Sequence, residues 1–116
     1  MSITRLILIA TVFMLVSEPA RGIDAKGAYI IVGLTVSCET WTAARAGYNN
    51  TKQAQLTSWV DGILTGYNRY VAGKTDITSG VEFNRLGGWI DNYCRANPLN
   101  KLATAVFALI EHLDKR

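Results

Sequence analysis

The sequence has few of the residues that build metal sites and catalytic centres. Its 116 residues include one histidine and two cysteines, and the cysteines are not arranged as Cys-x-x-Cys. Zinc sites need several such ligands, and nucleophilic catalysis needs a base held beside the nucleophile. His112 is close to the C-terminus, where a cation stabilised by a helix dipole is the simpler interpretation. We therefore expect no metal, no cofactor, no catalytic residue and no enzyme activity.

The chain also lacks a strong charge of either sign. From Ile23 onward it has ten Lys or Arg and eight Asp or Glu, which gives a net charge of +2. These charges are scattered along the chain, whereas proteins that bind nucleic acid or anionic membranes concentrate basic residues on one face. We expect neither a nucleic-acid partner nor, once the leader is removed, a membrane partner.

The N-terminal hydrophobic run is too short for a stable membrane anchor. Residues 6–16 form an apolar run of 11 residues, whereas a spanning helix needs about 20. Arg5 precedes the run, and the small residues Ala20 and Gly22 follow it, which is typical of a cleaved secretory signal. We expect residues 1–22 to be the signal peptide and residues 23–116 to form one periplasmic domain. Cleavage after Ala20 or Ser17, or an uncleaved signal anchor, are the alternatives.

The two cysteines are expected to form a disulfide. Oxidising compartments preserve disulfides, and Cys38 and Cys94 have no other cysteine with which to pair. A metal site or a catalytic thiol pair is the alternative, but the chain offers no supporting ligands for it. A bond between segments so distant in the sequence would be a large part of the stability of so small a domain.

Helical periodicity and helix-end signals predict an all-α bundle of about four helices. We expect helices at residues 37–46, 53–72 and 79–94, and a last one from Pro98 to about residue 113. Residues 49–51 offer a cap for the second helix, and Gly73 a stop. No pattern suggests enough strands for a sheet. Residues 28–36 are apolar and β-branched, so they form either an extended segment over the core or the first turns of a helix.

Two further start signals and an apolar stripe support the last two helices. Ser79 and Glu82 have the spacing of a capping box, and Asn97 followed by Pro98 is typical of an N-cap and a first helical position. These signals place Cys94 at the turn between two helices. The predicted apolar stripe of the last helix consists of Leu99, Leu102, Ala103, Val106, Phe107, Ile110 and Leu113.

The candidate binding residues are apolar and aromatic. Gly62 and Gly66 lie four residues apart, which is typical of close helix packing; the functional alternative is a groove in which a partner's chain lies. Three Trp and five Tyr are many for this length, and aromatic residues are enriched at interfaces. The candidate protein-binding residues are Tyr29, Ile30, Ile31, Val32, Trp59 and Tyr67.

With its leader, the early Cys38, the helix at residues 59–67 and the junction at residues 89–98, the chain resembles the periplasmic acid-stress chaperones HdeA and HdeB. The resemblance covers most of residues 38–113 as a pattern. It implies an all-helical protein with the disulfide Cys38–Cys94 and a final helix that starts at Pro98. It also implies a homodimer at neutral pH that loosens in acid and exposes apolar surface to unfolded client proteins.

A weaker resemblance leads to a different class of protein-binding function. The glycine-tyrosine helix and the Trp-rich composition are similar to the Rap and Tai immunity proteins, which are exported helical inhibitors of secreted amidase toxins. Sequence alone therefore predicts a periplasmic protein-binding module. A chaperone-like or stress-associated role comes first, and an immunity-type inhibitor or an accessory subunit of an envelope or secretion complex is the alternative.

Overall fold

The computed structural model describes residues 26, 35–47, 49–73 and 75–116. The chain divides into two compact units, Met1–Ile30 and Ile31–Arg116. Lys26 alone is described in the first unit, so the account below concerns the second. The expected signal peptide, its cleavage site and the candidate residues Tyr29 to Val32 lie outside the described residues.

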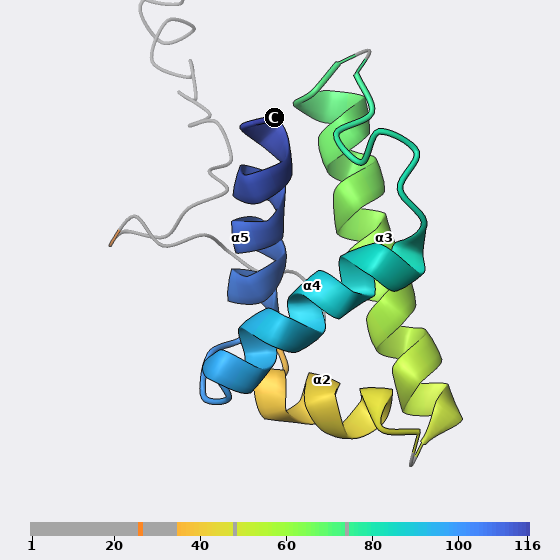
Figure 1. Cartoon of the computed structure of the whole chain (residues 1–116), viewed down its shortest axis with the longest axis vertical. Helices are drawn as coiled ribbons and strands as arrows, with labels where there is room; N and C mark the ends of the chain where they lie inside the picture. The colour runs from red at the N-terminus through yellow and green to blue at the C-terminus, as the bar shows by residue number, and fades with distance from the viewer. Residues whose placement is uncertain (1–25, 27–34, 48, 74) are drawn as a thin grey trace, which may run out of the picture. The chain divides into compact units, whose positions relative to one another are not determined.

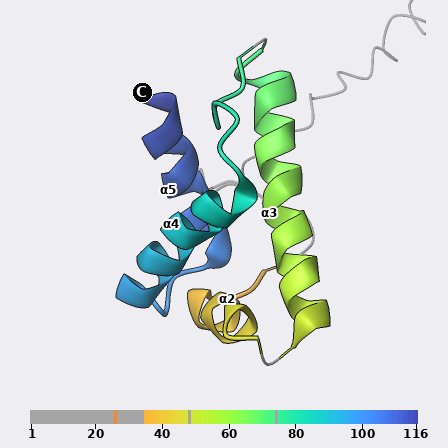
Figure 2. The ribbon, with the colours of Figure 1, turned by 45° about the vertical axis from the view of Figure 1, so that its right-hand side comes forward.

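Four helices make up the described part of the chain, which has no strand beyond one isolated bridge pair. They are α2 (Cys38–Arg45), α3 (Asn50–Tyr70), α4 (Phe83–Ala96) and α5 (Leu102–Asp114). α2 lies across one end of α3 and α5, which run away from it in the same direction (Figure 1). α4 packs on α2 and on α5 and has few contacts with α3, as the second view also shows (Figure 2). The all-α prediction is therefore confirmed.

The first two helices begin and end where local signals place them. The Ser37 side chain accepts a hydrogen bond of 3.1 Å from the Thr40 amide, and the chain leaves α2 through Gly47 at φ +86°. The Asn49 side chain accepts one of 2.9 Å from the Lys52 amide and so caps α3. The Asn49 cap is the one predicted within residues 49–51, although α3 begins at Asn50, three residues earlier than expected.

The predicted capping box between Ser79 and Glu82 is wrong. Ser79 has a left-handed φ of +53°, and α4 begins at Phe83 after Glu82, whose side chain makes no capping hydrogen bond. The preceding acid explains the difference. Asp76 accepts hydrogen bonds from the Thr78 and Gly80 amides, which fold residues 76–80 into a turn of their own and leave Ser79 unable to start a helix.

The predicted helix start at Asn97 and Pro98 is also wrong. Asn97 ends α4, and α5 begins at Leu102. Residues 98–101 instead run beside residues 36–38 through the backbone bonds Cys38 N to Asn100 O at 2.7 Å and Leu102 N to Val36 O at 2.9 Å. This long-range pairing and a turn closed by the bond from Asn100 N to Asn97 O at 3.1 Å keep the segment out of a helix, and Leu99, predicted to lie in the apolar stripe, is 89% exposed.

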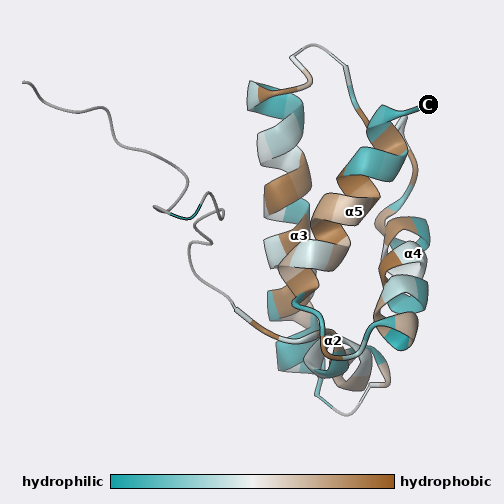
Figure 3. Cartoon of the chain, turned by 90° about the vertical axis from the view of Figure 1, so that its left-hand side faces the viewer, coloured by the Kyte–Doolittle hydropathy of each residue, from teal (hydrophilic) through white to brown (hydrophobic). Residues whose placement is uncertain are grey.

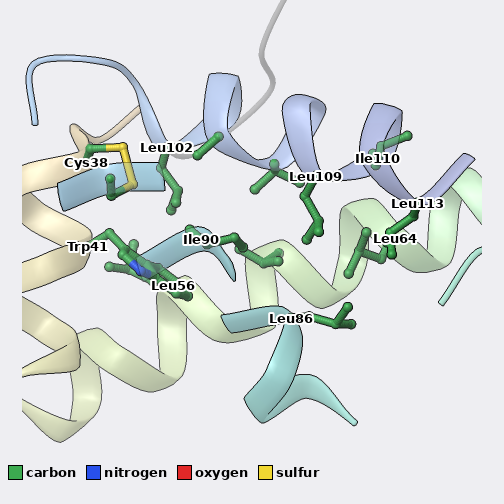
Figure 4. Close-up of a cluster of buried hydrophobic side chains, with 14 of the residues drawn as sticks. Cys38, Trp41, Leu56, Leu64, Leu86, Ile90, Leu102, Leu109, Ile110 and Leu113 are labelled. Carbon is green, nitrogen blue, oxygen red and sulfur yellow. A yellow bond between two sulfur atoms is a disulfide. The ribbon is translucent and has the colours of Figure 1, made fainter. Parts of the chain in front are cut away.

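The core lies between the four helices and is closed at one end by the disulfide. Cys38 and Cys94 are joined, and both are fully buried next to Leu102 (Figure 4). Trp41 is also fully buried and lies beside Leu56 and Ile90. On α5 the predicted stripe is buried except for Phe107, which is 36% exposed. The core therefore takes residues from all four helices.

Loss of the disulfide should lower the free energy of unfolding by about 4 kcal/mol, because the bond closes a loop with a sequence separation of 56 residues. The double variant Cys38→Ser and Cys94→Ser of residues 23–116 would be compared with the same residues in the oxidised form by urea denaturation. A Ser37→Ala variant, which loses one helix cap, is the control and should lose about 1 kcal/mol. Equal losses in the two proteins would contradict a major role for the crosslink.

Candidate functional site

Asp91 of α4 is the centre of a polar cluster that joins α2 to α4. It accepts a hydrogen bond of 2.7 Å from Trp41 Nε1. It also accepts hydrogen bonds from Nε and Nη2 of the Arg45 guanidinium, at 3.0 and 2.9 Å. Arg45 also lies 5.5 Å from the centre of the Trp41 ring. A bidentate guanidinium–carboxylate pair is among the stronger polar contacts in proteins. The cluster satisfies the one polar atom of a fully buried tryptophan.

Gly87 lies beside this cluster, at a position where a larger side chain would have to displace the neighbouring side chains. A Cβ at Gly87 would lie 3.3 Å from Arg45 Nη2 and 3.3 Å from the Phe83 ring. Close packing therefore limits the residue at Gly87, whereas Gly88 has no atom within 4 Å of the corresponding position. Asp61 lies exposed on α3. Desolvation raises the pKa of Asp61.

Asp76 organises the loop between α3 and α4. Its carboxylate accepts hydrogen bonds from the side chains of Asn68 and Thr78 and from the amides of Thr78 and Gly80. Bonds from Thr78, then Asn68 and Gly80, lower the pKa of Asp76 to about 2. Asn68 also accepts a bond of 3.1 Å from the Ile77 amide, which ties the loop to the end of α3. Ile77 itself is buried in the core.

Tyr67 and Asp114 join the far ends of α3 and α5. Hydrogen bonding with the Asp114 carboxylate, then desolvation and the negative charge of Asp114, raise the pKa of Tyr67. The neutral phenol is therefore favoured in the folded state. The stabilisation that it supplies is present below the usual pKa of tyrosine, near 10, and is lost as the pH rises through the raised value.

The two predicted binding residues within the described chain, Trp59 and Tyr67, lie two turns apart on α3. Both are half-buried and pack against the core, as does Ile63 between them. Figure 3 shows apolar positions on both α3 and α5. The expectation of close packing at Gly62 and Gly66 is wrong, since a Cβ at either would meet no atom within 4 Å.

A second aromatic group, which the sequence-based candidates did not include, lies on α4 and α5. The Trp89 ring stacks on Tyr93 at 5.8 Å and on His112 at 5.6 Å between ring centres. His112 is thus a surface residue that contacts an aromatic ring. Its spacing from Trp89 in the sequence carries no local signal of this contact, because the two residues belong to different helices.

The hollows on the surface are shallow. One, of about 370 Å³, lies between α2 and the start of α3 and is lined by Glu39, Thr40, Ala43, Ala44, Asn49 and Lys52. Another, of about 320 Å³, is formed by residues 79–82 and Arg85. The surface features with most apolar character are the flanks of α3 and α5 and the exposed Tyr70, Val71 and Leu99.

Replacing Asp91 should be among the more damaging changes to a carboxylate. Asp91→Ala leaves Trp41 Nε1 and the Arg45 guanidinium without their acceptor, and we expect a loss of about 2 kcal/mol in the free energy of unfolding. Urea denaturation at neutral pH would measure it. Asp61→Ala, which removes an exposed carboxylate from α3, is the matched control and should change stability by less than about 0.5 kcal/mol. A loss of similar size in both variants would be evidence against the cluster.

The loop should keep its structure well into the acid range. Because the folded pKa of Asp76 is lowered to about 2 from 3.8, its stabilisation is fully present above the unfolded value and disappears as the pH falls through about 2. NMR titration of the Asp76 carboxyl carbon and of the Thr78 and Gly80 amides should show that midpoint. Asn68→Ala removes one donor and should move the midpoint upward, whereas Asn92→Ala on α4 should leave it unchanged. A midpoint near 3.8 in the unaltered protein would contradict the assignment.

In the described residues, no group of three or more His, Cys, Asp or Glu could hold a metal ion, and no helix is long and apolar enough to cross a membrane. Comparisons of the chain with protein families, with curated proteins and with solved structures found no match. The functional argument therefore depends on the residues and contacts described above.

Proposed function

We propose that the protein is an exported, periplasmic protein-binding module with a chaperone-like or stress-associated role, which binds unfolded client proteins when acid loosens its helices. The observation that carries this proposal concerns the bonds between helices. In the described part of the chain, the side-chain hydrogen bonds between helices run from Trp41 and Arg45 of α2 to the Asp91 carboxylate of α4. The Asp114 carboxylate of α5 raises the pKa of Tyr67 on α3.

Protonation acts on these bonds directly. A neutral Asp91 no longer forms an ion pair with Arg45, and a neutral Asp114 is a weaker acceptor for Tyr67. The disulfide is unaffected by acid, so α2 and α4 stay joined while the polar ties are lost. Acid would then separate helices without releasing the chain, and the apolar residues between the helices would become available to a client.

The surface at neutral pH also supports a protein partner. Tyr70 is 84% exposed and Val71 67% exposed at the end of α3, and the half-buried Trp59 and Tyr67 lie along the flank of the same helix. Aromatic side chains of this kind contribute strongly to protein interfaces. The shallow hollows offer little enclosure for a small molecule, which typically binds in a deep apolar cleft.

An immunity-type inhibitor is the second candidate, and the open glycines of α3 favour it. Gly62 and Gly66 have no packing role in the described fold, yet they flatten the helix between Trp59 and Tyr67. A specific partner could approach the α3 backbone closely there. This candidate requires tight binding by the folded protein at neutral pH, whereas the chaperone-like function requires acid.

The mature domain, titrated from pH 7 to pH 2, should bind an apolar-surface dye and suppress aggregation of an acid-denatured client as the helices loosen. Oligomer mass would be recorded alongside, since a homodimer is expected to dissociate. The double variant Asp91→Asn and Asp114→Asn should bind dye at a higher pH than the unaltered protein, because its ties lack charge at every pH. Asp61→Asn is the control and should not shift the transition. A domain that binds no dye and protects no client anywhere in this range excludes the chaperone-like function.

A further inference from the structure

Helix α3 is the longest helix of the described chain and buries the smallest share of its residues. Of its 21 residues, three are buried: Leu56, Val60 and Leu64. By comparison α5 buries seven of 13 residues and α2 three of eight. Because burial of apolar side chains is the main force that holds helices together, α3 is the helix held least firmly for its length.

Polar contacts add little to this attachment. Within the described residues, the polar side-chain link of α3 to another helix is that of Tyr67 with Asp114 of α5, which raises the pKa of Tyr67. The Asn68 side chain bonds to Asp76 and to the Ile77 amide, which belong to the loop that directly follows α3. Those bonds make the loop move with α3 and do not tie it to α4 or α5.

The other three helices are joined by stronger links. Cys38 and Cys94 connect α2 to α4 covalently, and the Arg45–Asp91 ion pair connects the same two helices again. The backbone bonds from Cys38 to Asn100 and from Leu102 to Val36 connect the start of α2 to the start of α5. α2, α4 and α5 therefore form a linked unit that does not depend on α3.

Residues suited to a hinge lie on either side of α3. Gly47 has φ +86° just before the helix, and Ser79 and Gly80 have φ +53° and +73° beyond the loop that is bonded to it. Short connections with left-handed residues can absorb backbone rotation while the elements on each side stay intact. Figure 1 shows α3 entered and left through loops at its two ends.

We propose that α3, together with the loop bonded to it, is a hinged arm that separates from the linked unit of α2, α4 and α5 and uncovers the apolar trough that it fills. Trp41 lies beside Leu56 and Leu113 beside Leu64, so these residues of α2 and α5 form the walls (Figure 4). The trough now accepts apolar side chains at every fourth residue of a helix. An amphipathic segment of a client with that spacing is its occupant, a use that rests on the proposed function.

Native-state hydrogen exchange of the oxidised mature domain at neutral pH, with small additions of denaturant, tests the arm. We expect amides of α3 to exchange as one group, at least about tenfold faster than the slowest amides of α4 and α5, and with a weaker dependence on denaturant. Exchange of all helices at one rate and one dependence would overturn the proposal. Exchange of α3 residue by residue inward from its ends, with no common opening, would overturn it as well.

Two variants separate opening of the arm from global unfolding. Leu102→Ala, at a fully buried position of α5 next to the disulfide, should speed exchange in α4 and α5 and leave α3 unchanged. Val60→Ala weakens docking of α3 and should speed all three helices by one common factor. Faster α3 exchange in Leu102→Ala, equal to that of α4, would show that α3 opens only on global unfolding. If Leu102→Ala does not fold, the rates of the unaltered protein decide alone.

Hydrogen exchange and the client-aggregation assay together distinguish failure of the arm from failure of the proposed function. An arm that opens, in a protein that never suppresses client aggregation, leaves the conformational proposal in place and removes the chaperone-like role. Aggregation suppressed by a protein whose α3 exchanges only with global unfolding keeps the role and removes the arm.

Discussion

The crosslink between Cys38 and Cys94 is the constraint on which the rest of this small fold depends. It lies fully buried where the start of α2 meets the end of α4, and the backbone pairing of residues 36–38 with residues 98–102 brings the start of α5 to the same place. Three helices are thus fixed at one end by covalent and backbone bonds. A domain of this size has little apolar surface to bury, and such an anchor compensates for that shortage.

The links of the fold differ in their chemistry. At the α2 end, the helices are joined by sulfur and by backbone hydrogen bonds, which are indifferent to pH in the ordinary range. The same end also carries a charged link, because Asp91 accepts hydrogen bonds from Trp41 and Arg45 of α2. Away from it, the Asp76 carboxylate folds the loop between α3 and α4. The crosslink, the ion pair and the backbone bonds thus all lie where α2 meets α4 and α5.

Helix existence, the number of helices and the disulfide could be predicted from the sequence because local signals carry them. The caps at Ser37 and Asn49 and the 3.6-residue period act within one turn. The predictions failed where a distant or competing partner decided the outcome. The Asp76 backbone oxygen accepts the Ser79 amide and its carboxylate accepts the Gly80 amide, so a turn replaces the expected capping box. The backbone bonds of residues 36–38 with residues 100 and 102 keep residues 98–101 out of the last helix.

The candidate site was less predictable for the same reason. Trp41 and Arg45 meet Asp91 across about half of the chain, and no periodicity reports such a contact. Trp59 and Tyr67 could be chosen as exposed candidates by residue type, but their half-buried place on the flank of α3 depends on how that helix packs. Gly62 and Gly66 suggested close helix packing, but close packing against a glycine occurs instead at Gly87.

The position of α3 in the chain has a topological consequence. Both ends of the helix lie inside the covalent ring that the disulfide closes, so a helix that leaves its place stays tethered on two sides. Its return is an intramolecular event with an effective concentration on the order of millimolar. A ligand from solution competes with α3 for the same trough. It remains bound only if its free concentration, or its affinity for the trough, is high enough to outweigh the effective concentration of α3. A ligand should therefore occupy the trough only briefly. The return of α3 would release it to solution without any input of chemical energy.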